Sequence, residues 1–277
     1  MSLARRGLLP SLFAGLLDGC SAAAMLNATV PREGFSLERD IAYGPLPRHK
    51  LDLYRPERPR ADGRSVIFFY GGAWDSGSKS DYLFVGQALA ARGITTIIAD
   101  YRLYPEVTFP AFLEDGAQAT AWAADRIGTD RLFLMGHSAG AHIAVMLAAD
   151  TPWLAAAGID RLRLPGAIGL SGPYDFLPLT SRRLQQIFGG ANRKETQPIT
   201  FATAPLPSLL LIHGTADLTV KPANSERLAA AWRRAGGRVD LTLYPEIDHV
   251  DVVAAFSDFL HKRAPTRADV LAWIDKA

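Results

Sequence analysis

The motif Gly136-His-Ser-Ala-Gly140 places a serine between two glycines. The apolar run from Leu132 to Met135 predicts a strand buried on both faces, and the Ala-rich segment up to Ala149 predicts a helix. At a sharp strand-to-helix turn, a side chain at either glycine would collide with the neighbouring strand or helix. The pattern therefore predicts that Ser138 is a nucleophile, presented on a strained backbone at the top of a sheet.

A serine hydroxyl is a weak nucleophile at neutral pH, so it needs a neutral imidazole and a carboxylate that orients the imidazole. The strand predicted over 208–213 leads into a loop that carries Asp217, and the strand predicted over 238–244 leads into a loop that carries His249. The order serine, acid, histidine is that of α/β-hydrolases, and differs from the orders of chymotrypsin and subtilisin. We therefore predict a triad of Ser138, Asp217 and His249.

The oxyanion that forms on the substrate is stabilised by backbone N–H donors. In α/β-hydrolases some of these donors come from the loop that corresponds here to the one after the strand predicted over 65–70. That loop reads Tyr70-Gly-Gly-Ala-Trp74, and its glycines allow the backbone to approach a substrate closely. We expect Gly72 and Ala73 to donate, together with Ala139 at the start of the helix.

Aromatic side chains are expected to form the wall of the substrate pocket, namely Trp74, Tyr174, Phe176 and Phe188. They favour short acyl chains or a small aryl ester. Other candidates are expected to have other roles: His213 beneath the acid loop, His137 and His142 pointing away from the serine, His49 and His261 at the surface, Asp175 in a turn, and Asp248 and Asp251 too near His249 in sequence to replace Asp217.

Strands alternate with helices along most of the chain. We expect strands over 37–43, 50–54, 65–70, 94–99, 132–135, 167–171, 208–213 and 238–244, and helices over 81–91, 110–127, 222–235, 252–263 and 267–276. This alternation predicts a doubly wound, mostly parallel sheet of about eight strands in a single domain over 36–277. The proline-containing segment 172–207 interrupts it and is predicted to be a small cap insertion.

The composition is that of a globular protein, with 277 residues of which 48% are hydrophobic and 21% charged. The formal charge of +2 and the absence of a basic tract argue against nucleic-acid binding. No Cys/His spacing typical of zinc occurs, and the predicted chemistry requires neither a metal nor an organic cofactor. The single cysteine, Cys20, excludes an internal disulfide.

Residues 1–35 form a separate N-terminal segment. Arg5 and Arg6 precede an apolar run from Gly7 to Leu17, which resembles a secretory signal and is too short to span a membrane. Cys20 stands where a bacterial lipoprotein carries its lipid, so membrane anchoring in the cell envelope is one expectation. An amphipathic helix that packs on the domain of a cytoplasmic protein is the alternative.

Over residues 36–264 the chain resembles α/β-hydrolases of the small bacterial carboxylesterase group, close to hormone-sensitive-lipase-like esterases and kynurenine formamidases. The matching pieces are Leu51-Asp-Leu-Tyr-Arg-Pro56, Tyr70-Gly-Gly-Ala-Trp74, Asp100-Tyr-Arg-Leu-Tyr-Pro105, Gly136-His-Ser-Ala-Gly140, His213-Gly-Thr-Ala-Asp217 and Asp248-His249. Those families commonly have histidine where this chain has Tyr70. We therefore expect different side-chain hydrogen bonds to brace this loop.

The resemblance implies a serine carboxylesterase that cleaves a small-molecule ester through an acyl-enzyme. An arylformamidase acting on N-formylkynurenine is the alternative. A peptidase of the prolyl-oligopeptidase type is disfavoured because no propeller precedes the hydrolase region. A catalytically silent binding protein is disfavoured by the intact triad pattern.

Overall fold

An eight-stranded sheet forms the centre of the protein in the computed structural model, which describes residues 19–277. The strand order is β1-β2-β4-β3-β5-β6-β7-β8. The strands are β1 (Phe35–Ala42), β2 (Lys50–Pro56), β3 (Ser65–Phe69), β4 (Thr95–Ala99), β5 (Leu132–His137), β6 (Ala167–Leu170), β7 (Leu209–Gly214) and β8 (Val239–Tyr244). β2 pairs antiparallel with both β1 and β4, whereas all pairs from β4 through β8 are parallel. The predicted fold class is confirmed.

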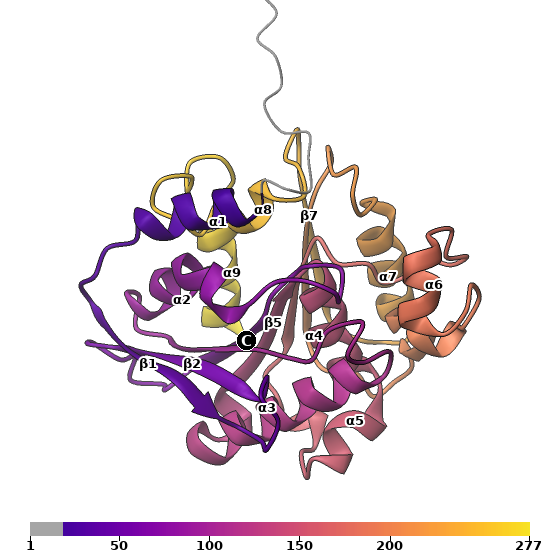
Figure 1. Ribbon diagram of the computed structural model, residues 1–277, viewed down its shortest axis with the longest axis horizontal. Coiled ribbons are helices and arrows are strands. Elements are labelled where there is room, and N and C mark those ends of the chain that lie inside the picture. Colours follow the sequence, from indigo (N-terminus) through magenta and orange to yellow (C-terminus); the bar gives the residue numbers. More distant parts are fainter. Residues whose placement is uncertain (1–18) are drawn as a thin grey trace, which may run out of the picture.

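Helices cover both faces of the sheet, with α2 and α9 on one side and α3, α4 and α7 on the other (Figure 1). The α-helices are α1 (Gly19–Ala28), α2 (Leu83–Ala90), α3 (Ala111–Ile127), α4 (Ala139–Ala149), α5 (Thr151–Ala156), α6 (Arg182–Phe188), α7 (Ala223–Arg234), α8 (Asp251–Ala254) and α9 (Thr266–Lys276). Short 3-10 helices lie at Lys79–Tyr82, Thr129–Arg131, Arg161–Arg163, Lys194–Thr196 and Pro198–Phe201.

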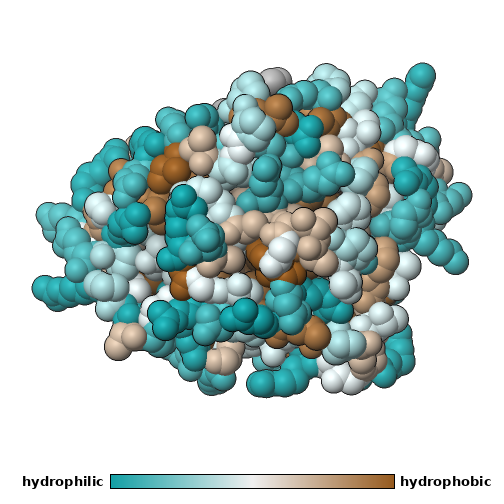
Figure 2. Space-filling view, turned by 90° about the horizontal axis from the view of Figure 1, so that it is seen from below, coloured by the Kyte–Doolittle hydropathy of each residue, from teal (hydrophilic) through white to brown (hydrophobic). Residues whose placement is uncertain are grey.

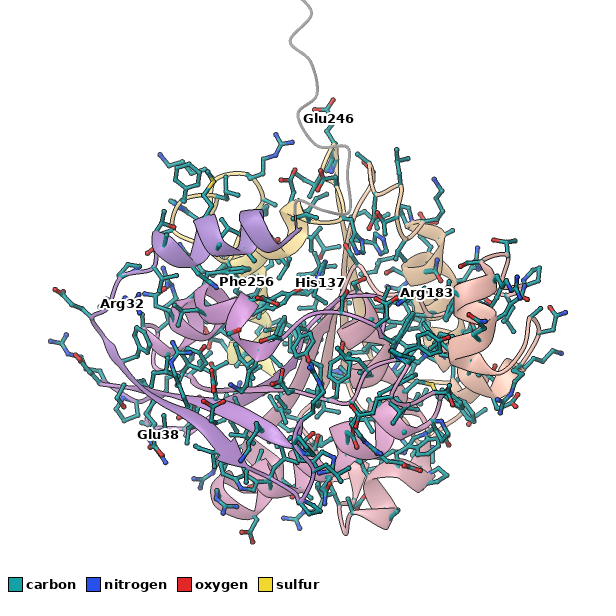
Figure 3. All side chains as sticks on the ribbon, viewed as in Figure 1. Arg32, Glu38, His137, Arg183, Glu246 and Phe256 are labelled. Atoms are coloured by element: carbon teal, nitrogen blue, oxygen red, sulfur yellow. The ribbon has the colours of Figure 1, made fainter. Side chains whose placement is uncertain are left out.

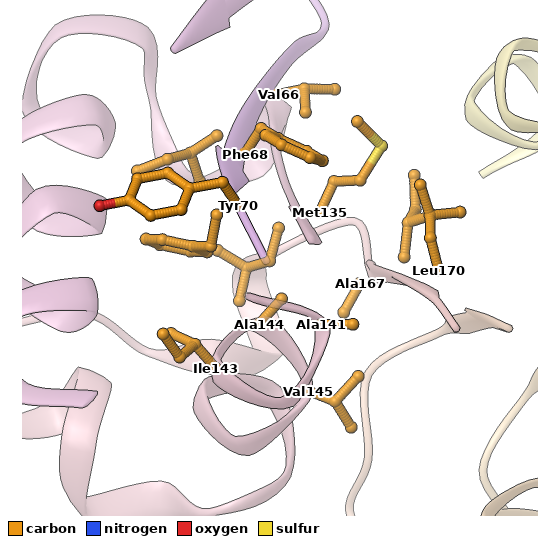
Figure 4. Close-up of a cluster of buried hydrophobic side chains, with 14 of the residues drawn as sticks. Val66, Phe68, Tyr70, Met135, Ala141, Ile143, Ala144, Val145, Ala167 and Leu170 are labelled. Carbon is orange, nitrogen blue, oxygen red and sulfur yellow. The ribbon is translucent and has the colours of Figure 1, made fainter. Parts of the chain in front are cut away.

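The central strands β3, β5, β6 and β7 are buried along their whole length. Parallel strands covered by helices on both faces need apolar residues at every position, which explains the continuous hydrophobic runs in the sequence. α4 is also fully buried, and its small residues, Ala141 and Ala144 among them, let it approach the sheet closely (Figure 4). Fully buried elements therefore support the Gly136–Gly140 turn on both sides.

One predicted helix is wrong in extent. The helix expected over 252–263 ends at Ala254 and continues as turns. Ser257 bonds to the local backbone, donating to the Ala254 carbonyl and accepting from the Leu260 amide. Such local side-chain bonds compete with the helical ladder and end it. The other predicted strands and long helices lie within a few residues of their expected bounds.

The segment over 172–207 carries α6 and two 3-10 turns beside the carboxyl edge of the sheet. α6 is attached to neighbouring loops, since the Phe109 amide donates to the Ile187 carbonyl and Arg183 forms an ion pair with Asp75. The segment thus lies against the loop that follows β3.

The predicted secretory or lipoprotein signal falls mainly on residues 1–18, which lie outside the described residues. It stays a prediction. Further along, α1 packs on the domain: Leu26 is buried, and Asn27 bonds to the backbone of Ser80 and Phe84. Among residues 19–277, no helix is long and apolar enough to cross a bilayer. The lower face of the molecule is mostly hydrophilic, with small groups of apolar residues (Figure 2).

Candidate active site

Ser138 lies at the turn between β5 and α4, with backbone angles of φ 54° and ψ −120°. This conformation is strained for a residue with a side chain. A Cβ on Gly136 would collide with the backbone of Gly140 and Ala141, and a Cβ on Gly140 would collide with the carbonyls of β3 and Tyr70. The two glycines are therefore required by the close approach of strand and helix, as the sequence predicts.

The structure brings the three residues of the predicted triad together. Nε2 of His249 lies 2.9 Å from Oγ of Ser138, and its Nδ1 lies 2.7 Å from Oδ2 of Asp217. A carboxylate can only accept, so Nδ1–H donates to Asp217 and Nε2 is left to accept from the serine hydroxyl. In this tautomer the imidazole is ready to take the serine proton.

Asp217 is buried and hydrogen-bonded on both oxygens. Its Oδ1 accepts from the amides of Thr219 and Val220, and its Oδ2 lies 3.1 Å from Nε2 of His213 as well as near His249. Burial raises the pKa of Asp217, but the bonds from the two histidines outweigh burial and hold the pKa well below its usual value of 3.8. The carboxylate therefore stays charged at neutral pH.

His213 occupies the expected place beneath the acid loop. Its Nε2–H faces both the Asp217 carboxylate and the Val220 carbonyl, and its Nδ1 accepts from the Ser225 hydroxyl at 2.8 Å. His213 thus fixes the acid rather than taking part in proton transfer with Ser138.

The loop after β3, residues 70–74 and here called the oxyanion loop, has an unusual backbone. Gly72, Ala73 and Trp74 have φ angles of 135°, 49° and 62°. A Cβ on Gly71 would lie 3.0 Å from Cβ of Ser138, so the loop runs directly beside the serine. Within the described residues, the amides of Gly72 and Ala73 donate to no backbone or side-chain acceptor. These two N–H groups are free to bind an oxyanion.

Tyr70 replaces the histidine common in similar families, and its bonds differ accordingly. Its hydroxyl accepts from Nη2 of Arg48 at 2.6 Å, and its carbonyl accepts from the Tyr101 hydroxyl at 2.8 Å. The rings of Tyr70 and Tyr101 stack with centroids 4.7 Å apart. Arg48 also donates to the carbonyl of Gly77 on the far side of the oxyanion loop. Two buried tyrosines and the half-buried Arg48 therefore brace this loop.

Sequence reasoning missed the role of His137. As expected it makes no hydrogen bond to Ser138, but its Nε2–H donates to the His249 carbonyl at 3.0 Å and its ring lies 4.9 Å from the His249 ring. Figure 3 shows His137 below the loop that follows β8, whose tip is marked by Glu246. Burial, with the nearby His249 ring as a smaller cause, lowers the pKa of His137 to about 3. His137 is thus a neutral clamp on the loop of His249. The one indication of this role in the sequence is that a histidine stands inside a turn that otherwise requires small residues.

Three of the four predicted wall residues form one aromatic cluster. The Trp74 ring lies 4.7 Å from the Phe188 ring and 6.1 Å from the Phe176 ring. His142 joins them, and burial lowers its pKa to about 4. Tyr174 is not part of this cluster, because its buried ring packs instead against the glycines at 169 and 172.

In the described part of the chain, the remaining candidates form no hydrogen bond with the side chains of the triad. His49 was expected at the surface, but it is buried and bonds to Asp115 of α3 at 3.1 Å, a contact between segments distant in sequence. Asp248 accepts from the amides of Val250 and Asp251 and so shapes the loop. Asp175 pairs with Arg227, and His261 is exposed. In the part of the chain that the structure describes, no group of three or more acidic, cysteine or histidine residues could hold a metal.

Comparison with known proteins agrees with this geometry. The BD-FAE family model matches residues 51–232, which include the oxyanion loop, Ser138 and Asp217. The chain belongs to the BD-FAE family. The match spans most of the α/β-hydrolase fold described above.

The chain is also similar to curated proteins that carry different enzyme names. A probable isoprenylcysteine alpha-carbonyl methylesterase of Oryza sativa is 31% identical over 240 residues, covering 77% of this chain and 58% of the relative. A kynurenine formamidase of Danio rerio is 27% identical and covers 79% of this chain and 76% of the relative. The chain thus spans less than two thirds of the methylesterase. A crystal structure of esterase B from Lactobacillus rhamnosis shares the fold, with a TM-score of 0.78 at 20% identity over 94% of this chain and 91% of that one.

Proposed function

We propose that this BD-FAE family protein is a serine carboxylesterase that hydrolyses short-chain or small aryl esters. The observation that carries the proposal is the line of hydrogen bonds from Asp217 through His249 to Ser138, with lengths of 2.7 and 2.9 Å. In acyl-transfer enzymes with this arrangement, the imidazole takes the serine proton at the moment of attack and the carboxylate stabilises the imidazolium that forms. The methylesterase relatives support the same reaction class.

The reaction follows from the positions of these atoms. Oγ of Ser138 attacks the ester carbonyl carbon while Nε2 of His249 takes its proton, and the oxyanion receives hydrogen bonds from the oxyanion loop and the Ala139 amide. The C–O bond to the alcohol then breaks, and His249 returns the proton to the leaving oxygen. Water repeats both steps and releases the acid, while Asp217 stabilises the imidazolium throughout.

Turnover of p-nitrophenyl acetate tests the proposal. Ser138→Ala should lower kcat by at least about 10⁴-fold, because it removes the nucleophile. Ser36→Ala, an exposed serine on β1, is the matched control and should keep full activity. An organophosphate should add one label per chain, on Ser138. If the organophosphate added no label and the two variants had equal turnover, the enzyme hypothesis would be refuted and the binding-protein alternative would remain.

Formamide hydrolysis is the second candidate, because the chain spans 76% of the zebrafish formamidase and only 58% of the rice methylesterase. The same acyl-enzyme chemistry would cleave a C–N bond instead of a C–O bond. Parallel assays of p-nitrophenyl acetate and N-formylkynurenine separate the two candidates. A kcat/KM at least tenfold higher for the formamide would establish the second.

A further inference from the structure

Four donors surround the carboxylate of Asp217. Its Oδ1 accepts from the backbone amides of Thr219 and Val220, at 2.9 and 2.8 Å. Its Oδ2 lies 2.7 Å from Nδ1 of His249 and 3.1 Å from Nε2 of His213. The catalytic base and a second histidine therefore share one oxygen atom of the acid.

The surroundings of His213 fix which of its nitrogens carries the proton. The side chain is fully buried, and Nε2 faces two acceptors, the Asp217 carboxylate and the Val220 carbonyl at 2.8 Å. Two acceptors at Nε2 require a proton there, so Nδ1 is left to accept from the buried Ser225 hydroxyl, also 2.8 Å away. His213 therefore donates toward the acid and shares this N–H between the carboxylate and the carbonyl.

The loop of Asp217 has support that does not involve His213. The Ala216 amide donates to the Ile247 carbonyl at 3.0 Å, which joins the loop after β7 to the loop that carries His249. Together with the two amides at Oδ1, this bond holds the acid beside the base. The additional effect of His213 is electrostatic, because it directs an N–H at the oxygen that faces the base.

A donor at Oδ2 weakens the attraction between Asp217 and the protonated form of His249. The carboxylate stabilises this imidazolium because its negative charge lies 2.7 Å from Nδ1. An N–H that points at the same oxygen neutralises part of that charge. With His213 in place, the imidazolium is stabilised less, so His249 is free to take the serine proton at a lower pH.

Other charged groups lie around the base. The titratable side chains on the loop of His249, or bonded to that loop, include His137, Glu246, Asp248, Asp251 and Arg263. Burial lowers the pKa of His137 to about 3, so this ring is neutral. Glu246 and Asp248 are exposed to water, which screens their charges, and Asp251 is paired with Arg263 at 2.8 Å. A substitution at position 213 changes none of these groups.

We propose that His213 is a positioning residue that extends the activity of the enzyme toward acidic pH, provided that the protein is the esterase proposed above. It shares Oδ2 of Asp217 with His249 and thereby keeps the base unprotonated in mildly acidic solution. Ser225 holds His213 in the tautomer that this role requires. His213 touches neither the substrate nor Ser138, so it sets where activity begins on the pH scale and has little effect on the maximal rate.

Two substitutions that differ by one methylene test the proposal. The amide of His213→Gln can donate from the place of Nε2, whereas the shorter side chain of His213→Asn reaches only the level of Nδ1. The dependence of kcat/KM for p-nitrophenyl acetate on pH gives the midpoint of the acid limb, which reports protonation of the base. His213→Asn should raise this midpoint by about 0.5 to 1 pH unit and leave the plateau within about threefold. His213→Gln should keep the midpoint of the unmodified protein.

The unmodified protein provides a second measurement that does not depend on how the variants fold. Nitrogen NMR of isotope-labelled histidines should show His213 protonated on Nε2 alone, and its N–H signal should move as His249 titrates, because both rings donate to one oxygen. A proton on Nδ1 of His213 would overturn the proposal. So would a lower plateau for His213→Asn with an unchanged midpoint, which would leave the esterase function intact. Absence of any Ser138-dependent ester hydrolysis would overturn both.

Discussion

Gly140→Ala should lower the turnover rate strongly while the protein still folds. An alanine Cβ at this position would lie 2.5 Å from the Tyr70 carbonyl oxygen and closer still to the Phe69 carbonyl, whereas real Cβ contacts are not shorter than 3.0 Å. The obstacle is backbone, so β3 and α4 must move apart by at least about 0.5 Å, the difference between these two values. α4 begins just after Ser138, and β3 leads into the oxyanion loop. The substitution therefore increases the distance between the nucleophile and its oxyanion donors.

The expected magnitudes follow from this displacement. A misplacement of about 1 Å costs about 10²-fold in rate, so kcat should fall about 10- to 100-fold. Overpacking of this kind also costs about 1 to 3 kcal/mol of unfolding free energy. Both can be measured on one preparation, with kcat from p-nitrophenyl acetate corrected for the fraction of sites that an organophosphate labels, and stability from urea unfolding followed by circular dichroism.

Gly158→Ala is the matched control. Gly158 has a φ of 79°, so alanine is strained there, but its Cβ would meet no atom within 4 Å. This variant should lose about 1 kcal/mol of stability and keep its kcat. If Gly140→Ala kept kcat within twofold of the unmodified protein, the close approach of β3 and α4 would not position the site, and the reasoning would be refuted.

Three further results are expected. Asp217→Asn should lower kcat about 10³- to 10⁴-fold with an unchanged circular dichroism spectrum, because an amide cannot hold the required tautomer; activity within tenfold would contradict the assigned acid. His137 and His142 have pKa values lowered to about 3 and about 4 from 6.5, so the unfolded state binds more protons below pH 6.5. The contribution of these two histidines to stability should therefore be fully present above pH 6.5 and should fall as the pH drops toward 4. The urea midpoint should be lower at pH 5.0 than at pH 7.5, and His142→Gln should reduce this difference. Tyr70→Phe should lower the free energy of unfolding by about 1 to 3 kcal/mol, because it leaves the partly buried guanidinium of Arg48 without its 2.6 Å partner. Tyr104→Phe loses a 3.3 Å bond at an exposed position and should change the free energy of unfolding little in the same assay.

Local sequence patterns predict much of this fold because the buried parallel strands need continuous apolar runs, and because the turn around Ser138 needs glycines at fixed positions. The meeting of Asp217 and His249 is predictable for the same reason, since each lies in the loop after a parallel strand and the carboxyl ends of these strands meet at one edge of the sheet. These features depend on residues close together in the chain.

The features that sequence reasoning missed depend on contacts between distant segments. His49 is buried because Asp115, 66 residues later, lies within hydrogen-bonding distance. His137 clamps a carbonyl 112 residues away, and nothing in the turn itself indicates which loop will lie above it. The predicted wall residue Tyr174 packs elsewhere because two glycines of β6 and its loop leave space for its ring.

The position of β8 at the edge of the sheet limits the thermal stability of the site. In the described part of the chain this strand pairs with β7 alone, and most of its residues are partly exposed, yet the loop that follows it carries His249. Edge strands fray at lower temperatures than the centre of a sheet. On warming, the base should therefore leave the serine while β3, β5 and β6 are still intact, so catalytic lifetime is limited by fraying of one strand and reversible inactivation precedes melting of the domain.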